Sequence, residues 1–218
     1  MKVAIVVGHT SKGKGAYALE PLVDGVPSTA EFDFNNLVAD KMVEFSEGFS
    51  FFSKPELKRF NRPHLGGPYG KEIRAVYGEV DDWGADFSME LHFNWAGRSS
   101  VKGAQCLSSG SSGSLKFANI VQRHMERVMG QGRFLTGVEI RTRGDGAGAL
   151  KAGRAPAILT EPFFGTNPDS VRKVQQLGVD GFARMYWDAI KELAGIREDD
   201  EGSCLLYTSD AADDFVRV

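Results

Sequence analysis

The sequence predicts a single α/β domain whose twisted, mostly parallel central sheet has helices on both faces. Two continuous apolar runs, Val3–Val7 and Pro156–Thr160, are typical of strands buried on both faces. Between them, short apolar runs alternate with segments of helical periodicity, which favours a parallel sheet with helical crossovers. A chain of 218 residues with 42% hydrophobic side chains suits one globular domain. We expect that domain to span residues 1–203.

The first part of the chain is expected to begin with the strand Val3–Val7, followed by a long loop. Residues 10–29 contain three glycines and two prolines, and a loop of this length is often functional. Ser28 or Thr29 is expected to cap a helix that Gly48 ends, and Phe49–Phe52 is expected to form the second strand. Apolar residues recur along that helix at helical spacing, namely Phe34, Leu37, Val38, Met42 and Phe45.

The remaining segments continue the alternation of strands and helices. A loop through Pro63 and Gly66-Gly67-Pro68 is expected before the next helix, and residues 133–154, rich in glycine and arginine, are interpreted as a segment with short strands at best. Further strands are expected at Phe87–Asn94, Lys102–Leu107 and Pro156–Thr160, and further helices at Lys71–Trp83, Leu115–Met129 and within 168–196.

The C-terminal residues are expected to lie outside the domain. The segment Cys204–Asp214, CLLYTSDAADD, resembles the translation of a transposase-type sequencing adapter. We therefore interpret residues 204–218 as a non-native or disordered tail. Without the net −2 of this tail the formal charge changes from −3 to −1, and Cys106 is the cysteine that remains. A single cysteine permits no internal disulfide, in keeping with a reducing compartment.

Composition and charge exclude several classes of protein. No stretch approaches the roughly 20 apolar residues of a transmembrane helix. The net charge of −3 provides no basic surface for nucleic acid. Because Met1-Lys2 runs directly into an expected buried strand, no signal peptide is expected, and we predict synthesis in the cytoplasm. We also expect the protein to be a monomer.

Four polar residues lie at the ends of expected elements, where an open α/β sheet collects ligands and catalytic groups. His9 follows the first strand and Glu31 begins the first helix, while His92 and Glu161 end two later strands. Two imidazoles and two carboxylates suit a zinc hydrolase with three ligands, an open position for water and a free carboxylate.

Each of these residues also has a simpler structural explanation. His9 would hydrogen-bond to loop backbone and His92 would be a satisfied core histidine. A carboxylate such as Glu31 in a first helical turn is stabilised by the helix dipole by about 0.3–1 kcal/mol. Glu161 differs, because Pro162-Phe163-Phe164 follow it and a charge in apolar surroundings is costly unless it is paired or functional.

Four blocks of the sequence occur in the order VVGHT, EFDFNNLVADKMV, ELHFN and PAILTEPFFGTN. In order and approximate spacing they resemble the zinc-dependent N-acetylmuramoyl-L-alanine amidases of the type 3 family, from Val3 to about Leu193. The resemblance implies that His9, Glu31 and His92 are the zinc ligands and that Glu161 is the catalytic carboxylate.

Some residues depart from the family pattern or compete with these assignments. Thr10 stands where the family has a second glycine, and Glu90 stands where it has a serine. Glu90 would share a strand face with His92, so it is either a partner of that ligand or a rival carboxylate. Glu20, in the long loop, is a weaker alternative to Glu31, because the residues after it do not align with the family helix.

The resemblance implies hydrolysis of the amide bond between N-acetylmuramic acid and L-alanine in peptidoglycan, with Glu161 as general base and acid. Arg141, Arg143 and Arg154 either meet carboxylates of the peptide stem or are solvated loop charges. The expected absence of a signal peptide favours a phage endolysin-like enzyme that acts on the wall after release. Two alternatives are a zinc amidohydrolase or peptidase of the same fold acting on another amide, and a non-catalytic wall-binding module.

Overall fold

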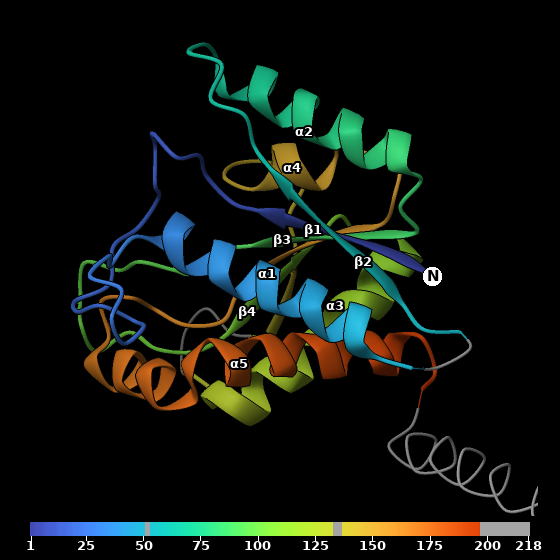
Figure 1. Cartoon of the computed structure of the whole chain (residues 1–218). Coiled ribbons are helices and arrows are strands. Elements are labelled where there is room, and N and C mark those ends of the chain that lie inside the picture. Colours follow the sequence, from blue (N-terminus) through green and yellow to red (C-terminus); the bar gives the residue numbers. More distant parts are fainter. Residues whose placement is uncertain (51–52, 133–136, 197–218) are drawn as a thin grey trace, which may run out of the picture.

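A six-stranded sheet runs through the centre of the described residues, which are 1–50, 53–132 and 137–196 of this computed structural model (Figure 1). In sheet order the strands are β2 (Glu56–Asn61), β1 (Lys2–Val7), β3 (Phe87–Leu91), β6 (Ala157–Glu161), β4 (Gln105–Ser108) and β5 (Gly137–Ile140). Neighbouring strands are parallel except β4 and β6, which are antiparallel. The predicted mostly parallel sheet is confirmed.

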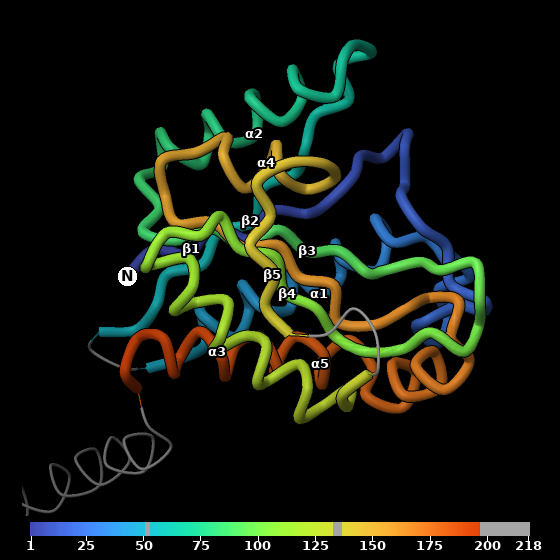
Figure 2. The backbone as a smooth tube through the Cα atoms, turned by 180° about the vertical axis from the view of Figure 1, so that it is seen from behind, coloured from blue at the N-terminus to red at the C-terminus, as the bar shows by residue number. Residues whose placement is uncertain are grey.

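Helices cover both faces of this sheet (Figures 1 and 2). One face carries α1 (Glu31–Gly48), α3 (Ser112–Met129) and α5 (Pro168–Leu193), and the other carries α2 (Tyr69–Trp83) and α4 (Ala147–Leu150). In β1, Val3, Ile5 and Val7 pack into the larger core, while Ala4 and Val6 pack against α2 on the opposite face. Burial on both faces explains the continuous apolar run of this strand.

The second strand lies at Glu56–Asn61, so its expected position at Phe49–Phe52 is wrong. Phe49 is partly buried and packs on the larger core after α1, and residues 51–52 lie outside the described residues. In β2 only Leu57 and Phe60 are buried, because this strand forms the edge of the sheet. Its polar sequence, ELKRFN, therefore carried too weak an apolar pattern to be recognised.

The start of α1 also differs in detail from the prediction. Ala30 occupies the N-cap position and makes no capping hydrogen bond through its side chain, so neither Ser28 nor Thr29 is the cap. The Ser28 hydroxyl instead hydrogen-bonds to the carboxylate of Asp33 in the first turn. Ser28 therefore still ties the long loop to the beginning of the helix.

Other boundaries shift by a few residues. β3 ends at Leu91, so that His92 and Asn94 lie just beyond the strand, and β4 begins at Gln105 rather than Lys102.

The expected tail, 204–218, lies outside the described residues and stays a prediction. Among the helices that the structure describes, none has both the length and the apolar character of a membrane span.

Candidate metal centre and catalytic site

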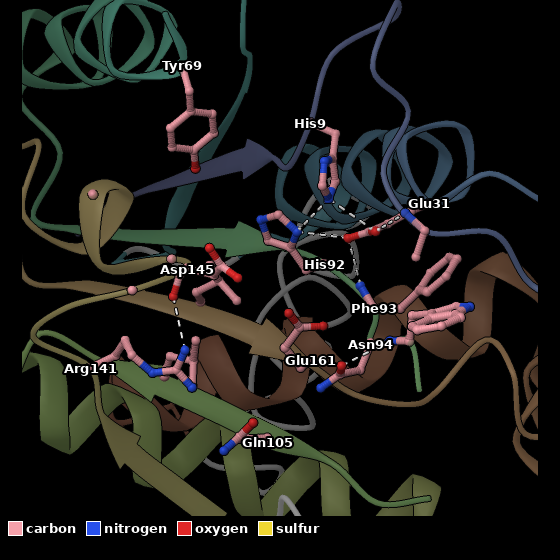
Figure 3. A pocket seen from close by; sticks show the side chains of 17 residues that line it. His9, Glu31, Tyr69, His92, Phe93, Asn94, Gln105, Arg141, Asp145 and Glu161 are labelled. Carbon is pink, nitrogen blue, oxygen red and sulfur yellow. Dashed lines mark hydrogen bonds and ion pairs between the residues drawn. The ribbon is translucent and has the colours of Figure 1, made fainter. Parts of the chain in front are cut away.

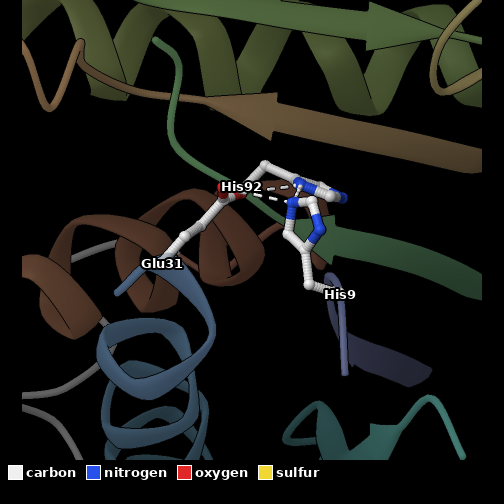
Figure 4. Close-up of side chains that lie close together, drawn as sticks. All are labelled: His9, Glu31 and His92. Carbon is white, nitrogen blue, oxygen red and sulfur yellow. Dashed lines mark hydrogen bonds and ion pairs between the residues drawn. The ribbon is translucent and has the colours of Figure 1, made fainter. Parts of the chain in front are cut away.

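Three side chains converge at the edge of the sheet where β1 and β3 end (Figure 4). These strands are adjacent and parallel, so His9 after β1 and His92 after β3 reach the same edge, and the start of α1 places Glu31 beside them. His9 Nε2 lies 3.2 Å from His92 Nδ1 and 3.1 Å from Glu31 Oε2. Glu31 Oε1 lies 2.8 Å from His92 Nδ1.

Two glycines make room for this convergence. A Cβ atom on Gly8 would lie 2.4 Å from the His92 ring, and one on Gly15 would lie 2.4 Å from the His9 ring and 2.6 Å from Glu31 Oε2. His9 itself has a φ of 66°, a left-handed conformation that is uncommon for residues other than glycine. Such strain is concentrated at functional sites.

The Glu31 carboxylate is held in its ionised form. It is buried, and its two oxygens accept backbone N–H groups of Ala16 at 2.8 Å and Phe93 at 3.0 Å. Burial by itself would raise the pKa of Glu31, but hydrogen bonds from His9 and His92 and the charges of both rings outweigh it and lower the pKa from 4.5 to about 2.

His92 lies between two carboxylates. Its Nδ1 faces Glu31, and its Nε2 lies 3.0 Å from Glu90 Oε1. Burial opposes a charge on this ring, but the hydrogen bonds that it donates to Glu31 and Glu90 and the negative charges of both carboxylates outweigh this effect and raise the pKa of His92 to about 10. The ring therefore occupies a position where the protein favours positive charge.

The three converging residues fit a zinc ion by donor type, spacing and charge. Two ring nitrogens and one carboxylate oxygen lie within 4.8 Å of one another. Tetrahedral ligands at 2.0–2.2 Å from an ion are roughly 3.3–3.6 Å apart. The observed separations of 2.8–3.2 Å are slightly shorter, so small outward movements of the donors would accommodate the ion.

Glu161 lies at the end of β6 and faces the same space without joining the three residues (Figure 3). It lines a cavity of about 770 Å³ together with His9, Glu31 and His92. Its Oε2 atom is buried and has no hydrogen-bond partner among the described residues. Burial raises the pKa of Glu161 to about 8, against the attraction of His92. Perturbed pKa values of this kind are concentrated at functional sites.

The two alternative carboxylates, Glu20 and Glu90, lie outside the group of three converging residues. Glu20 is exposed in the long loop, where its carboxylate is 3.5 Å from the side-chain nitrogen of Gln175. Glu90 is fully buried beneath His92, and Arg62 and Tyr77 both donate to it. The sequence singled out Glu90, but it contained no signal for Arg62 and Tyr77, because the three residues meet only in the folded chain.

The three candidate arginines have different surroundings. Arg141 lines the cavity, where Glu139 accepts a hydrogen bond from it at 2.6 Å. Arg143 is exposed, and Arg154 pairs with Asp81 while its side chain stays 78% exposed. Of the three, Arg141 is therefore the one placed to meet a ligand.

The sequence of this chain matches one known protein family. The model of the N-acetylmuramoyl-L-alanine amidase family matches residues 3–192. The chain belongs to this family. The resemblance predicted from the four sequence blocks is thus confirmed, and the family acts on peptidoglycan. No curated protein matches the amidase sequence.

Solved structures share the fold of this amidase at low sequence identity. The catalytic domain of an endolysin targeting Clostridia difficile is 21% identical, with a TM-score of 0.68 over 90% of this chain and 98% of that one. The catalytic domain of CwlV, an N-acetylmuramoyl-L-alanine amidase from Bacillus (Paenibacillus) polymyxa, is 19% identical, with a TM-score of 0.67 over 90% and 100%. An N-acetylmuramyl-L-alanine amidase from Mycobacterium smegmatis is 16% identical, with a TM-score of 0.66 over 89% and 97%.

Proposed function

We propose that this amidase is zinc-dependent and hydrolyses the bond between the lactyl group of N-acetylmuramic acid and the L-alanine of the peptide stem. One observation carries the proposal: His9, Glu31 and His92 converge beside a separate buried carboxylate, Glu161. Three ligands with a nearby free acid are the arrangement of a catalytic rather than a structural zinc site. Membership of the family supports the choice of substrate.

His9, Glu31 and His92 would hold the metal. When bound, zinc supplies a water molecule of lowered pKa and polarises the scissile carbonyl group. Glu31 meets the requirement for a charged ligand because its pKa of about 2 keeps it ionised at neutral pH. Its backbone donors, Ala16 and Phe93, also fix its orientation.

Glu161 would transfer the proton. Its Oε2 atom, which has no partner in the described part of the chain, is available to accept a proton from the attacking water and to return it to the leaving amine. A pKa raised to about 8 lies near neutral pH, where a group can both take up and release a proton. A nearby cation would lower this pKa and favour the ionised form that acts as base.

Arg141 would meet a carboxylate of the peptide stem. Its guanidinium group lies in the same cavity as Glu161, and its hydrogen bonds to Glu139 and to the carbonyl of Asp145, at 3.1 Å, hold it in place. A planar guanidinium is well suited to a carboxylate ligand.

A digestion experiment tests the proposed function. Zinc-loaded protein is incubated with purified peptidoglycan, and new N-terminal amines and new reducing sugar ends are measured together. We expect one new L-alanine amine for each bond cleaved and no new reducing ends. Release of a different N-terminal residue would show that another amide is the substrate, and no release at all would favour a wall-binding module.

A role in phage-type lysis is the further part of this proposal. It is supported by the shared fold of an endolysin catalytic domain. If the role is correct, bacteria expressing the protein should grow normally until their membrane is permeabilised and should then lyse. Lysis without permeabilisation would contradict it.

A further inference from the structure

Glu90 is a buried carboxylate that the proposed reaction does not use. It lies in β3 two residues before His92, on the same side of the strand, and its exposed fraction is 0%. A charge in such a position is costly unless it is paired and hydrogen-bonded. Its role therefore depends on the three hydrogen-bond donors that surround its carboxylate.

The first donor is the ring of His92. Nε2 of this ring lies 3.0 Å from Glu90 Oε1, whereas Nδ1 faces Glu31 Oε1 at 2.8 Å and His9 Nε2 at 3.2 Å. A neutral imidazole has one N–H donor and one nitrogen lone pair, and an ionised carboxylate only accepts. A hydrogen bond to Glu90 therefore requires the proton on Nε2 and leaves the Nδ1 lone pair directed at the metal position.

The other two donors hold the carboxylate in place. Arg62, which follows β2, donates to Oε1 at 2.5 Å, and Tyr77, in α2, donates to Oε2 at 2.8 Å. The side chains of Arg62 and Glu90 are 3% and 0% exposed. The ring of Tyr69 covers the Arg62 guanidinium, whose Cζ atom lies 4.8 Å from the ring centroid. Both oxygens of Glu90 are thus anchored by elements on the face of the sheet that carries α2.

We propose that Glu90 is a positioning residue, held by Arg62 and Tyr77, that fixes His92 as the Nε2-protonated tautomer and thereby strengthens metal binding through Nδ1. This inference rests on the proposed zinc site. Partners of this kind orient metal-binding histidines and raise their basicity, and their loss typically costs about 10- to 100-fold in metal affinity. A serine at this position, as in the family pattern, would supply no such charge.

A matched pair of variants isolates the carboxylate. Glu90→Met alone would leave Arg62 buried without a partner, so the test compares Arg62→Met with the double variant Arg62→Met/Glu90→Met. The two proteins differ only in the group that faces His92. We expect zinc to bind about 10- to 100-fold more weakly to the double variant, as measured by competition with a chelator. Glu90→Gln should bind with intermediate affinity, because an amide oxygen still accepts the ring proton.

The tautomer itself can also be observed directly. The chain contains four histidines, so a long-range ¹H–¹⁵N spectrum of the zinc-loaded protein should be assignable. We expect His92 to be protonated on Nε2, with a slowly exchanging ring proton that disappears in the double variant. Protonation on Nδ1, or equal zinc affinity in the two matched variants, would overturn the inference. Failure of the wild-type protein to bind zinc would instead overturn the proposed metal site on which the inference depends.

Discussion

The carboxylates on the two sides of the cavity have pKa values that are shifted in opposite directions. On the side formed by β1, β3 and α1, Glu31 has a donor for each oxygen and its pKa is lowered to about 2. On the side formed by β6, a buried oxygen of Glu161 has no partner within the described part of the chain, and the pKa is raised to about 8. Both groups are largely removed from water, so the hydrogen bonds and charges of His9 and His92 at Glu31, rather than burial, separate the two pKa values.

This difference predicts separate roles for the two carboxylates. A carboxylate that stays charged and fixed suits the permanent binding of a cation, whereas one that lacks partners and has a pKa near neutrality suits proton transfer. Changes on the first side should therefore affect metal content, and changes on the second side should affect turnover with the metal retained.

The largest effect is expected on the ligand side. His9→Ala should lose both stoichiometric zinc and activity, because two remaining ligands bind the ion poorly in water. Zinc content is measured by elemental analysis after dialysis. His64→Ala is the matched control, since His64 lies outside the cavity beside Glu72 and should keep its zinc. Full zinc occupancy in His9→Ala would mean that the ligand was wrongly assigned.

On the other side, Glu161→Gln should lower kcat by about 10²- to 10⁴-fold, the usual contribution of general acid–base catalysis. The substitution keeps the shape of the side chain but removes the proton acceptor. Zinc should stay bound, and binding of wall fragments should be largely unchanged. Loss of zinc together with activity would place Glu161 among the ligands, and unimpaired activity would assign the base to another residue.

A smaller effect is expected at Arg141, which lines the same cavity. Arg141→Gln should lower kcat/KM by about 10- to 100-fold, because a hydrogen bond to a charged group is worth about 1.5–3 kcal/mol. Arg143→Gln, at an exposed neighbour, serves as the control and should change little. The steady-state rates on a defined muramoyl peptide provide the comparison. Equal losses in both variants would argue for a general charge effect.

The contrast between the two carboxylates also predicts a pH dependence of stability. In the metal-free protein the pKa of Glu161, about 8, lies above its ordinary value of 4.5, so the folded state keeps a proton that the unfolded state releases. The free energy of unfolding should therefore fall as pH rises from about 4.5 to 8. Urea denaturation of the chelated wild type and Glu161→Gln should show curves that diverge over this range. Parallel curves would show that Glu161 titrates normally.

The smallest effect is expected outside both sides of the cavity. We propose that the domain ends near residue 203 and that residues 204–218 contribute nothing to it. Deletion of these residues should leave the melting temperature and the activity unchanged. A fall of several degrees in melting temperature, measured by calorimetry, would mean that the tail packs on the domain.

Sequence patterns predicted most of the fold because the central strands and the long helices have strong local periodicity. The run Val3–Val7 and the segment Pro156–Thr160 correspond closely to β1 and β6. The pattern failed at Glu56–Asn61, where an edge strand with two buried residues resembles a loop. Local periodicity reports burial, and an edge strand buries too little to be recognised.

The sequence by itself determined the fold class, the family resemblance and the four residues His9, Glu31, His92 and Glu161 as the candidate site. Only the tertiary structure decided how they are arranged. It separated Glu161 from the three converging residues, placed Arg141 rather than Arg154 in the cavity, and brought Arg62 and Tyr77 to Glu90. These outcomes depend on contacts between segments far apart in the chain, and the burial and hydrogen bonding that set each pKa exist only after those segments have packed.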